Sequence, residues 1–102
     1  MATYHTALAA LADPTRRSIF EHIVEGPRAV GELAAVLPVS RPAVSQHLRV
    51  LKEAELVVDS QIGARHVYQL NPSGLGALRT YLDRFWDQAL AAYAATAESD
   101  EE

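Results

Sequence analysis

Residues 38–52 read PVSRPAVSQHLRVLK, and this stretch is the most informative one for the fold. Its first proline marks a break, since proline cannot continue a helix. Two residues later, Ser40 can cap a new helix, because its side-chain oxygen accepts one of the unpaired backbone N–H groups at a helix start. We expect this helix to continue to about Ala54. A helical projection places three apolar side chains within about 60° of one another, facing the core: Val44, Leu48 and Leu51.

The other face of this helix carries side chains that can hydrogen-bond to DNA. Arginine can grip O6 and N7 of guanine, glutamine can pair with adenine, and serine serves either base. The N-terminal half of a recognition helix enters the major groove, which favours Arg41, Ser45 and Gln46 as base readers and leaves the far end for phosphate. His47 lies nearer the apolar side, where packing and phosphate contact are alternatives. The expected contacts on this helix are Ser40, Arg41, Pro42, Ser45, Gln46, His47, Arg49 and Lys52.

The distribution of charge supports this interpretation, although the formal net charge of the 102 residues is −4. Residues 80–102 hold one Arg and six acids, whereas residues 1–79 sum to +1. The stretch 38–52 holds three cations and no acid. The acidity therefore lies away from the expected DNA contacts, and it limits non-specific binding, which is mostly electrostatic. A merely solvated helix face is the alternative.

Proline and glycine breaks at 13–14, 26–27, 37–38, 63 and 71–72 divide the chain into short elements. Helices are expected at 3–12, 14–25 and 29–37. Asp13 caps the second of these, with Pro14 in its first position, where the missing N–H costs nothing. The second helix is expected to bury Ile19, Phe20, Ile23 and Val24.

Two β-rich runs, 56–60 and 66–70, flank a five-residue connection at 61–65 and predict a β-hairpin. Gly63 permits a turn with positive φ, and Arg65 beside it suits a narrow minor groove, whose negative potential attracts arginine. The alternative is an exposed loop arginine without a partner. The expected DNA contacts of this hairpin are Gln61, Gly63 and Arg65. The fold is thus mainly α-helical with a small β-hairpin, a winged helix-turn-helix; a helical bundle with an incidental hairpin is the alternative.

The last helix is expected from Pro72 to about Ala97, followed by an acidic, disordered tail at 98–102. Residues 1–97 then form one domain. The apolar stripe of this helix is longer than the other short elements can cover. A two-fold contact with a second copy would bury the excess. Packing of Trp86 and Tyr93 within one subunit is the alternative.

Three segments carry a family resemblance: ALADPTRR at 10–17, VGELA at 30–34 and SRPAVSQHLRVL at 40–51. They resemble the ArsR/SmtB family of bacterial transcriptional repressors. The hairpin and VYQLNP at 67–72 are similar to the family's wing and its exit into the last helix. The resemblance covers roughly residues 5–95.

The resemblance implies a homodimeric repressor of double-stranded DNA that binds an inverted-repeat operator and regulates its own gene. It also implies that the first and last helices build the dimer interface. The interface residues expected on this basis are Tyr4, Leu8, Leu11, Leu78, Leu82, Phe85, Trp86, Ala89 and Tyr93. A winged helix that binds only other proteins is the alternative function.

Metal-sensing members of the family use cysteines in the third helix or Asp and His ligands in the last helix. Ala29 and Gly31 stand at the cysteine positions, and no histidine follows His66. We therefore expect no metal site and no cofactor. Two modes of regulation stay open: constitutive autorepression, and control by a small organic effector that binds near the dimer interface.

The sequence also argues against an enzyme and against a membrane protein. The chain has no cysteine, no nucleophile elbow and no phosphate-binding loop. No apolar run approaches the roughly 20 residues that cross a bilayer. Residues 1–5 lack the features of a signal peptide, so a cytoplasmic protein is expected.

Overall fold

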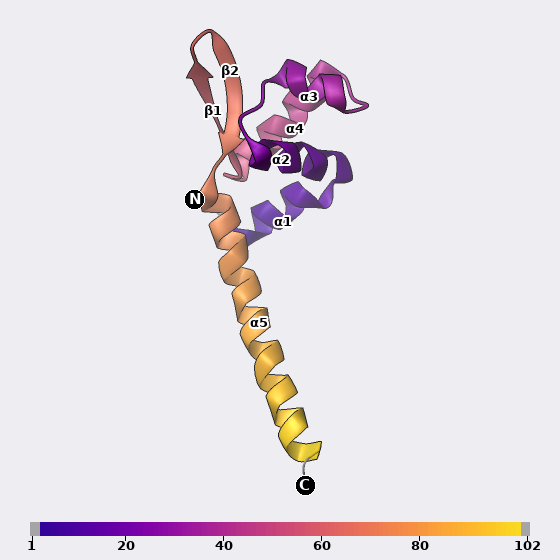
Figure 1. The fold of residues 1–102 in the computed structure, drawn as a ribbon, viewed down its shortest axis with the longest axis vertical. Coiled ribbons are helices and arrows are strands. Elements are labelled where there is room, and N and C mark those ends of the chain that lie inside the picture. Colours follow the sequence, from indigo (N-terminus) through magenta and orange to yellow (C-terminus); the bar gives the residue numbers. More distant parts are fainter. Residues whose placement is uncertain (1–2, 101–102) are drawn as a thin grey trace.

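The computed structural model describes residues 3–100 and the side chains of residues 3–98. Five helices and one hairpin follow one another along the chain (Figure 1). Their bounds are α1 Tyr4–Ala12, α2 Pro14–Glu25, α3 Val30–Val36, α4 Arg41–Glu53, β1 Val57–Ile62, β2 Arg65–Leu70 and α5 Pro72–Asp100. This order confirms the winged helix-turn-helix, with α3 and α4 as the helix-turn-helix and β1–β2 as the wing.

The helix starts are set by local caps that the sequence predicts. Asp13 Oδ2 accepts the backbone N–H of Arg16 at 2.9 Å, and Ser40 Oγ accepts that of Ala43 at 3.3 Å. Each cap satisfies one of the donors that a helix start leaves unpaired. The predicted starts of α2 and α4 are therefore confirmed.

The core forms where α4 packs against α2 and α3. Val44, Leu48 and Leu51 have no exposed surface, as the helical projection predicts. The buried side chains around them include Ile19, Phe20, Ile23, Leu33, Leu56 and Val57. The prediction for Val24 is wrong, since 51% of it is exposed. At 100° per residue, Val24 falls about 40° outside the arc of the other three apolar residues of α2.

The hairpin is tighter than the sequence suggests. β1 and β2 pair antiparallel from Val57 opposite Leu70 to Ile62 opposite Arg65, so only two residues connect them. The expected five-residue connection is therefore wrong. Gly63 has φ +63° and stands first in this two-residue turn, the position where a type II′ hairpin turn takes glycine.

The start of α5 docks on the end of α4. The N–H of Gly74 donates to the carbonyl of Glu55 at 2.9 Å, and the N–H of Asn71 donates to that of Leu56 at 2.9 Å. A Cβ on Gly74 would lie 2.6 Å from the carbonyl oxygen of Ala54, so only glycine allows this close approach.

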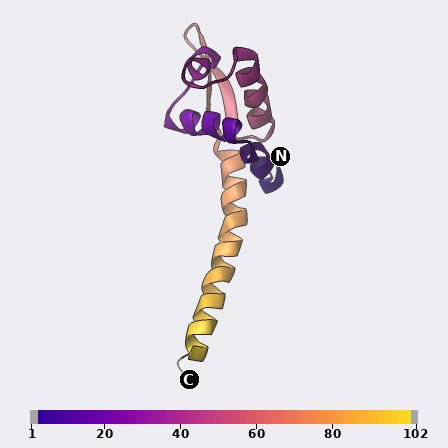
Figure 2. The ribbon, with the colours of Figure 1, turned by 90° about the vertical axis from the view of Figure 1, so that its right-hand side faces the viewer.

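Beyond its first turns, α5 leaves the rest of the molecule and continues alone (Figures 1 and 2). All described side chains from residue 82 to residue 98 are exposed. The radius of gyration is 18.0 Å, against about 13 Å for a compact domain of this length. The helix passes the expected end at Ala97 and reaches Asp100. Its last turns are rich in alanine, the strongest helix former.

Candidate nucleic-acid interface

The outward face of α4 presents the residues that the sequence singles out for DNA. Six of the eight lie exposed along this helix: Arg41, Pro42, Ser45, Gln46, Arg49 and Lys52. Ser40 is also exposed at the cap, and His47 is half-buried. The three side chains predicted to read bases thus lie exposed on the first two turns of a helix whose opposite face is buried in the core.

Arg41 lies against the helix before it. Its Nη2 atom would be 3.0 Å from a Cβ built on Gly31, so the absence of a side chain there gives the guanidinium room beside α3. The arginine at the N-terminal end of α4 is therefore positioned partly by the neighbouring helix. Spacing along the sequence does not indicate this contact.

His47 faces the corner between α1 and α2. Its Nδ1 lies 3.5 Å from Nη1 of Arg16, whose Nε donates to the carbonyl of Ala10 at 2.6 Å. Arg17 donates in the same way to the carbonyl of Leu11 at 3.0 Å. These two arginines close the C-terminal end of α1, where cations are favoured. Both belong to the ALADPTRR segment, whose pattern indicates a helix boundary but not this pairing.

Lys52 is joined to the wing. Its Nζ lies 2.8 Å from Oδ1 of Asp59 on β1, and Nε2 of His66 on β2 lies 2.9 Å from Oδ2 of the same carboxylate. Hydrogen bonds from Lys52 first, and then from His66, lower the pKa of Asp59 to about 2. The same bond raises the pKa of Lys52. The cation expected to hold phosphate is therefore paired with an acid of its own chain.

Arg65 at the end of the wing is also paired. Its Nη2 contacts Oε1 of Glu32 on α3, so the alternative of an arginine without a partner is wrong. The same oxygen accepts the backbone N–H of Ala29 at 2.9 Å. That N–H first, and then the charges of Arg65 and Arg28, lower the pKa of Glu32. Gln61 lies exposed on β1, and Gly63 lies exposed in the turn.

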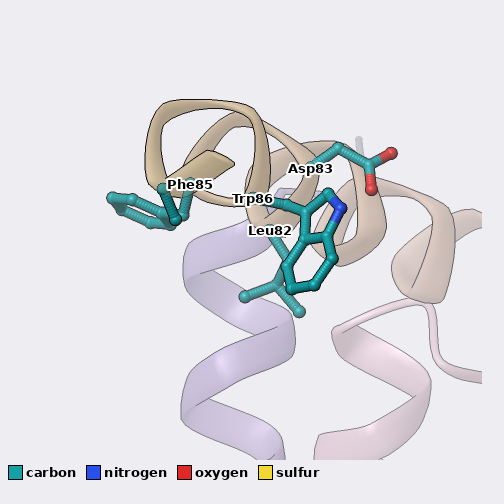
Figure 3. Close-up of a pocket in the computed structure, with 5 residues that line it drawn as sticks. Leu82, Asp83, Phe85 and Trp86 are labelled. Atoms are coloured by element: carbon teal, nitrogen blue, oxygen red, sulfur yellow. The ribbon is translucent and has the colours of Figure 1, made fainter. Parts of the chain in front are cut away.

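A second feature is the uncovered apolar face of α5 and α1. Its exposed large side chains are Leu8 at 42%, Leu82 at 50%, Phe85 at 50%, Trp86 at 65%, Leu90 at 51% and Tyr93 at 76%. Figure 3 shows Phe85 and Trp86 projecting from α5 on either side of Leu82. An open hollow of about 440 Å³ is bordered by Leu82, Asp83, Phe85, Trp86 and Ala89.

Some residues expected in this face lie elsewhere, and two residues near it are absent from the expected set. Leu78 is only 9% exposed and belongs to the core, so it has little surface left to bury against a partner. Tyr4 is half-buried against Tyr81 of α5, and Leu11 is half-buried against the core. The two additions are Leu90 and Tyr81. Leu90 follows Trp86 at a spacing of four residues, which is a helical signal that could have found it.

The four histidines lie on separate elements. His22 contacts the carbonyl of Ser18, and His5 lies against the ring of Tyr4. Within residues 3–98, no group of three or more His, Asp or Glu side chains gathers in a way that could hold a metal ion. Over the same part of the chain, no helix combines the length and the apolar character needed to cross a membrane.

Comparison with known proteins places this geometry in a family. A helix-turn-helix domain family matches residues 11–59. The HTH-type transcriptional regulator Rv2034 of Mycobacterium tuberculosis is 61% identical over 103 residues, which cover 98% of this chain and 96% of that protein. The arsenical resistance operon repressor of Staphylococcus xylosus is 33% identical over 78 residues, which cover 76% and 75%.

A solved structure agrees with these relatives. An ArsR-like transcriptional regulator from Rhodococcus sp. RHA1 is 32% identical, covers 92% of each chain and has a TM-score of 0.75. The chain therefore belongs to the ArsR/SmtB family of DNA-binding transcriptional repressors, a class of regulators rather than enzymes.

Proposed function

We propose that the chain acts as a homodimeric repressor that binds an inverted-repeat operator and represses its own gene. The observation that carries this proposal is the first half of α4, where Arg41, Ser45 and Gln46 lie exposed and no residue is acidic. Such side chains form bidentate or single hydrogen bonds with base edges in the major groove. Because its operator is DNA, we propose that the chain acts in the cytoplasm.

The dimer is supported by the uncovered face of α5. Half or more of Leu82, Phe85, Trp86, Leu90 and Tyr93 is exposed on a helix that projects into solvent. An isolated surface helix of this kind gains stability mainly from packing its apolar stripe. A second copy of the chain supplies the same stripe, and a two-fold contact buries both at once.

The two-fold symmetry of the dimer in turn determines how the operator half-sites are arranged. Two α4 helices related by a two-fold axis contact successive turns of the same DNA face, about 34 Å apart, and so select two inverted half-sites. Arg49 and Lys52 contact phosphates, and the wing residues Gln61, Gly63 and Arg65 follow the neighbouring backbone or minor groove. The DNA-binding and dimerising unit is one domain.

An electrophoretic mobility shift on the DNA upstream of the chain's own gene tests this proposal. We expect a specific complex that weakens with salt, with log K falling by roughly 0.9 per neutralised phosphate for each unit of log[salt]. Random DNA of equal length is the control. An absent or salt-insensitive shift would instead favour a winged helix that binds only proteins.

Sedimentation of a Trp86→Lys variant tests the dimer separately. We expect monomers or unfolded chain, because a charge replaces a large apolar side chain in the contact. Ala91→Lys is the matched control, since it adds the same charge on the opposite side of α5 and should stay dimeric. A Trp86→Lys variant that sediments as a dimer overturns the interface.

A further inference from the structure

Two of the cations expected on DNA are held by acids from other elements. Lys52 at the end of α4 pairs with Asp59 of β1, and Arg65 of β2 pairs with Glu32 of α3. Both cations belong to the proposed DNA-binding surface, and both acids lie next to it in space. The surface therefore carries part of its own counter-charge.

Both pairs are accessible to solvent. The side chains of Lys52 and Asp59 are 55% and 30% exposed, and those of Arg65 and Glu32 are 57% and 49% exposed. Exposed ion pairs contribute little to folding stability, so another anion can take the place of the acid without unfolding the chain. A DNA phosphate is such an anion, and it is fixed in position by the duplex.

The acids are held in place by further bonds, so they do not simply follow the cations. Glu32 also accepts a hydrogen bond from the backbone N–H of Ala29, and Asp59 also hydrogen-bonds with His66. When a cation swings to a phosphate, its acid therefore stays at the edge of the surface. There the carboxylate no longer neutralises the cation, and its negative charge faces the DNA.

We propose that Glu32 and Asp59 set the strength of DNA binding, as internal counter-ions that phosphates must displace from Arg65 and Lys52. This proposal rests on the proposed DNA-binding surface. Phosphate contacts carry no sequence information, so the two acids lower the affinity for operator and random DNA by the same factor. They restrain the chain from non-specific binding and leave base reading to the start of α4.

Glu32→Gln and Asp59→Asn test the inference in mobility shifts on operator and random DNA over a salt series. Both amides keep an acceptor oxygen for the neighbouring donors. We expect each variant to bind both DNAs more tightly by the same factor, at most about eight-fold per contact at 0.1 M salt. The slope of log K against log[salt] should steepen by up to roughly 0.9 per released cation.

The controls separate a local from a global charge effect. Glu98→Gln and Asp87→Asn change the net charge equally but lie on the projecting part of α5, and they should leave the affinity unchanged. Adding Arg65→Ala to Glu32→Gln should abolish the gain. Unchanged or weaker binding by Glu32→Gln, or equal tightening by Glu98→Gln, overturns the inference. Failure of the wild-type chain to bind any DNA would instead contradict the proposed function.

Discussion

The rings of Tyr4 and Tyr81 stack with their centroids 3.9 Å apart and their planes within 2° of parallel. Phe85 meets Tyr81 edge-on at 4.8 Å. This aromatic group joins α1 to α5 at the point where α5 leaves the core. The aromatic contacts pack the two helices against each other, and the uncovered apolar face of the proposed dimer begins beside them.

A double-mutant cycle on this stack tests its contribution. Tyr4→Leu and Tyr81→Leu should each lower the free energy of unfolding, and the coupling between them should be about 0.5–1.5 kcal/mol, the usual range for an aromatic pair. Tyr81→Phe keeps the ring and should retain most of the coupling. Urea unfolding at one protein concentration measures these values, and strictly additive effects would contradict the stack.

The two glycines at the start of α5 should respond in opposite ways to alanine. Gly74→Ala places a Cβ 2.6–2.9 Å from the backbone of Ala54 and Glu55, so we expect a loss of about 1–3 kcal/mol, as for other overpacked sites. Gly76 has nothing within 4 Å of an added Cβ. Gly76→Ala should therefore gain up to about 1 kcal/mol from helix propensity. A higher melting temperature for Gly74→Ala than for Gly76→Ala would contradict the close approach of Gly74 to the backbone of Ala54 and Glu55.

Asp59 should make a small part of the folding stability sensitive to acid, because its ion pair is exposed. Its pKa of about 2 in the folded chain lies below the ordinary 3.8, so the unfolded chain takes up its proton first as the pH falls. The stabilising contribution is complete above about pH 5 and is lost as the pH falls through about 2. Asp59→Asn should lose less stability than the wild type over this window in urea unfolding. Equal losses would show that the pairing with Lys52 does not favour the folded chain.

Arg41 and Arg49 should differ in the kind of DNA contact that each makes. Arg41→Ala should relax base preference at one position in each half-site, at a cost of about 1–3 kcal/mol if the arginine is bidentate. Arg49→Ala should weaken operator and random DNA alike and flatten the salt slope by roughly 0.9 for each phosphate that is no longer neutralised. Binding titrations on single-base operator variants distinguish the two. Uniform weakening by Arg41→Ala would reduce it to a phosphate contact.

The sequence predicts those parts of the fold whose signals are local. The caps Asp13 and Ser40 act within three residues, and the apolar spacing of α4 follows from one helical period. The order of elements and the outward face of α4 therefore follow from the sequence. Leu78 shows the limit of the same pattern, because periodicity marks an apolar face without saying whether α1 or a second copy covers it.

The counter-charges of the surface depend on tertiary geometry and escape sequence reasoning. Glu32 and Arg65 are 33 residues apart and meet only because the wing folds back beside α3. Lys52 and Asp59 lie on either side of the turn that leads from α4 into the wing. The hairpin connection differs from its expected length for a related reason, since pairing of Ile62 with Arg65 extends both strands beyond the β-rich runs.

Selection of bound sequences from a pool of random double-stranded DNA is the sharpest test of whether two copies of α4 read an operator. We expect an enriched inverted repeat whose half-site centres lie about 10 base pairs, or a multiple of that, apart. Arg41→Ala should remove one enriched position from each half-site. A pool that shows no enrichment, or a single site without two-fold symmetry, would contradict a dimer that reads DNA through α4.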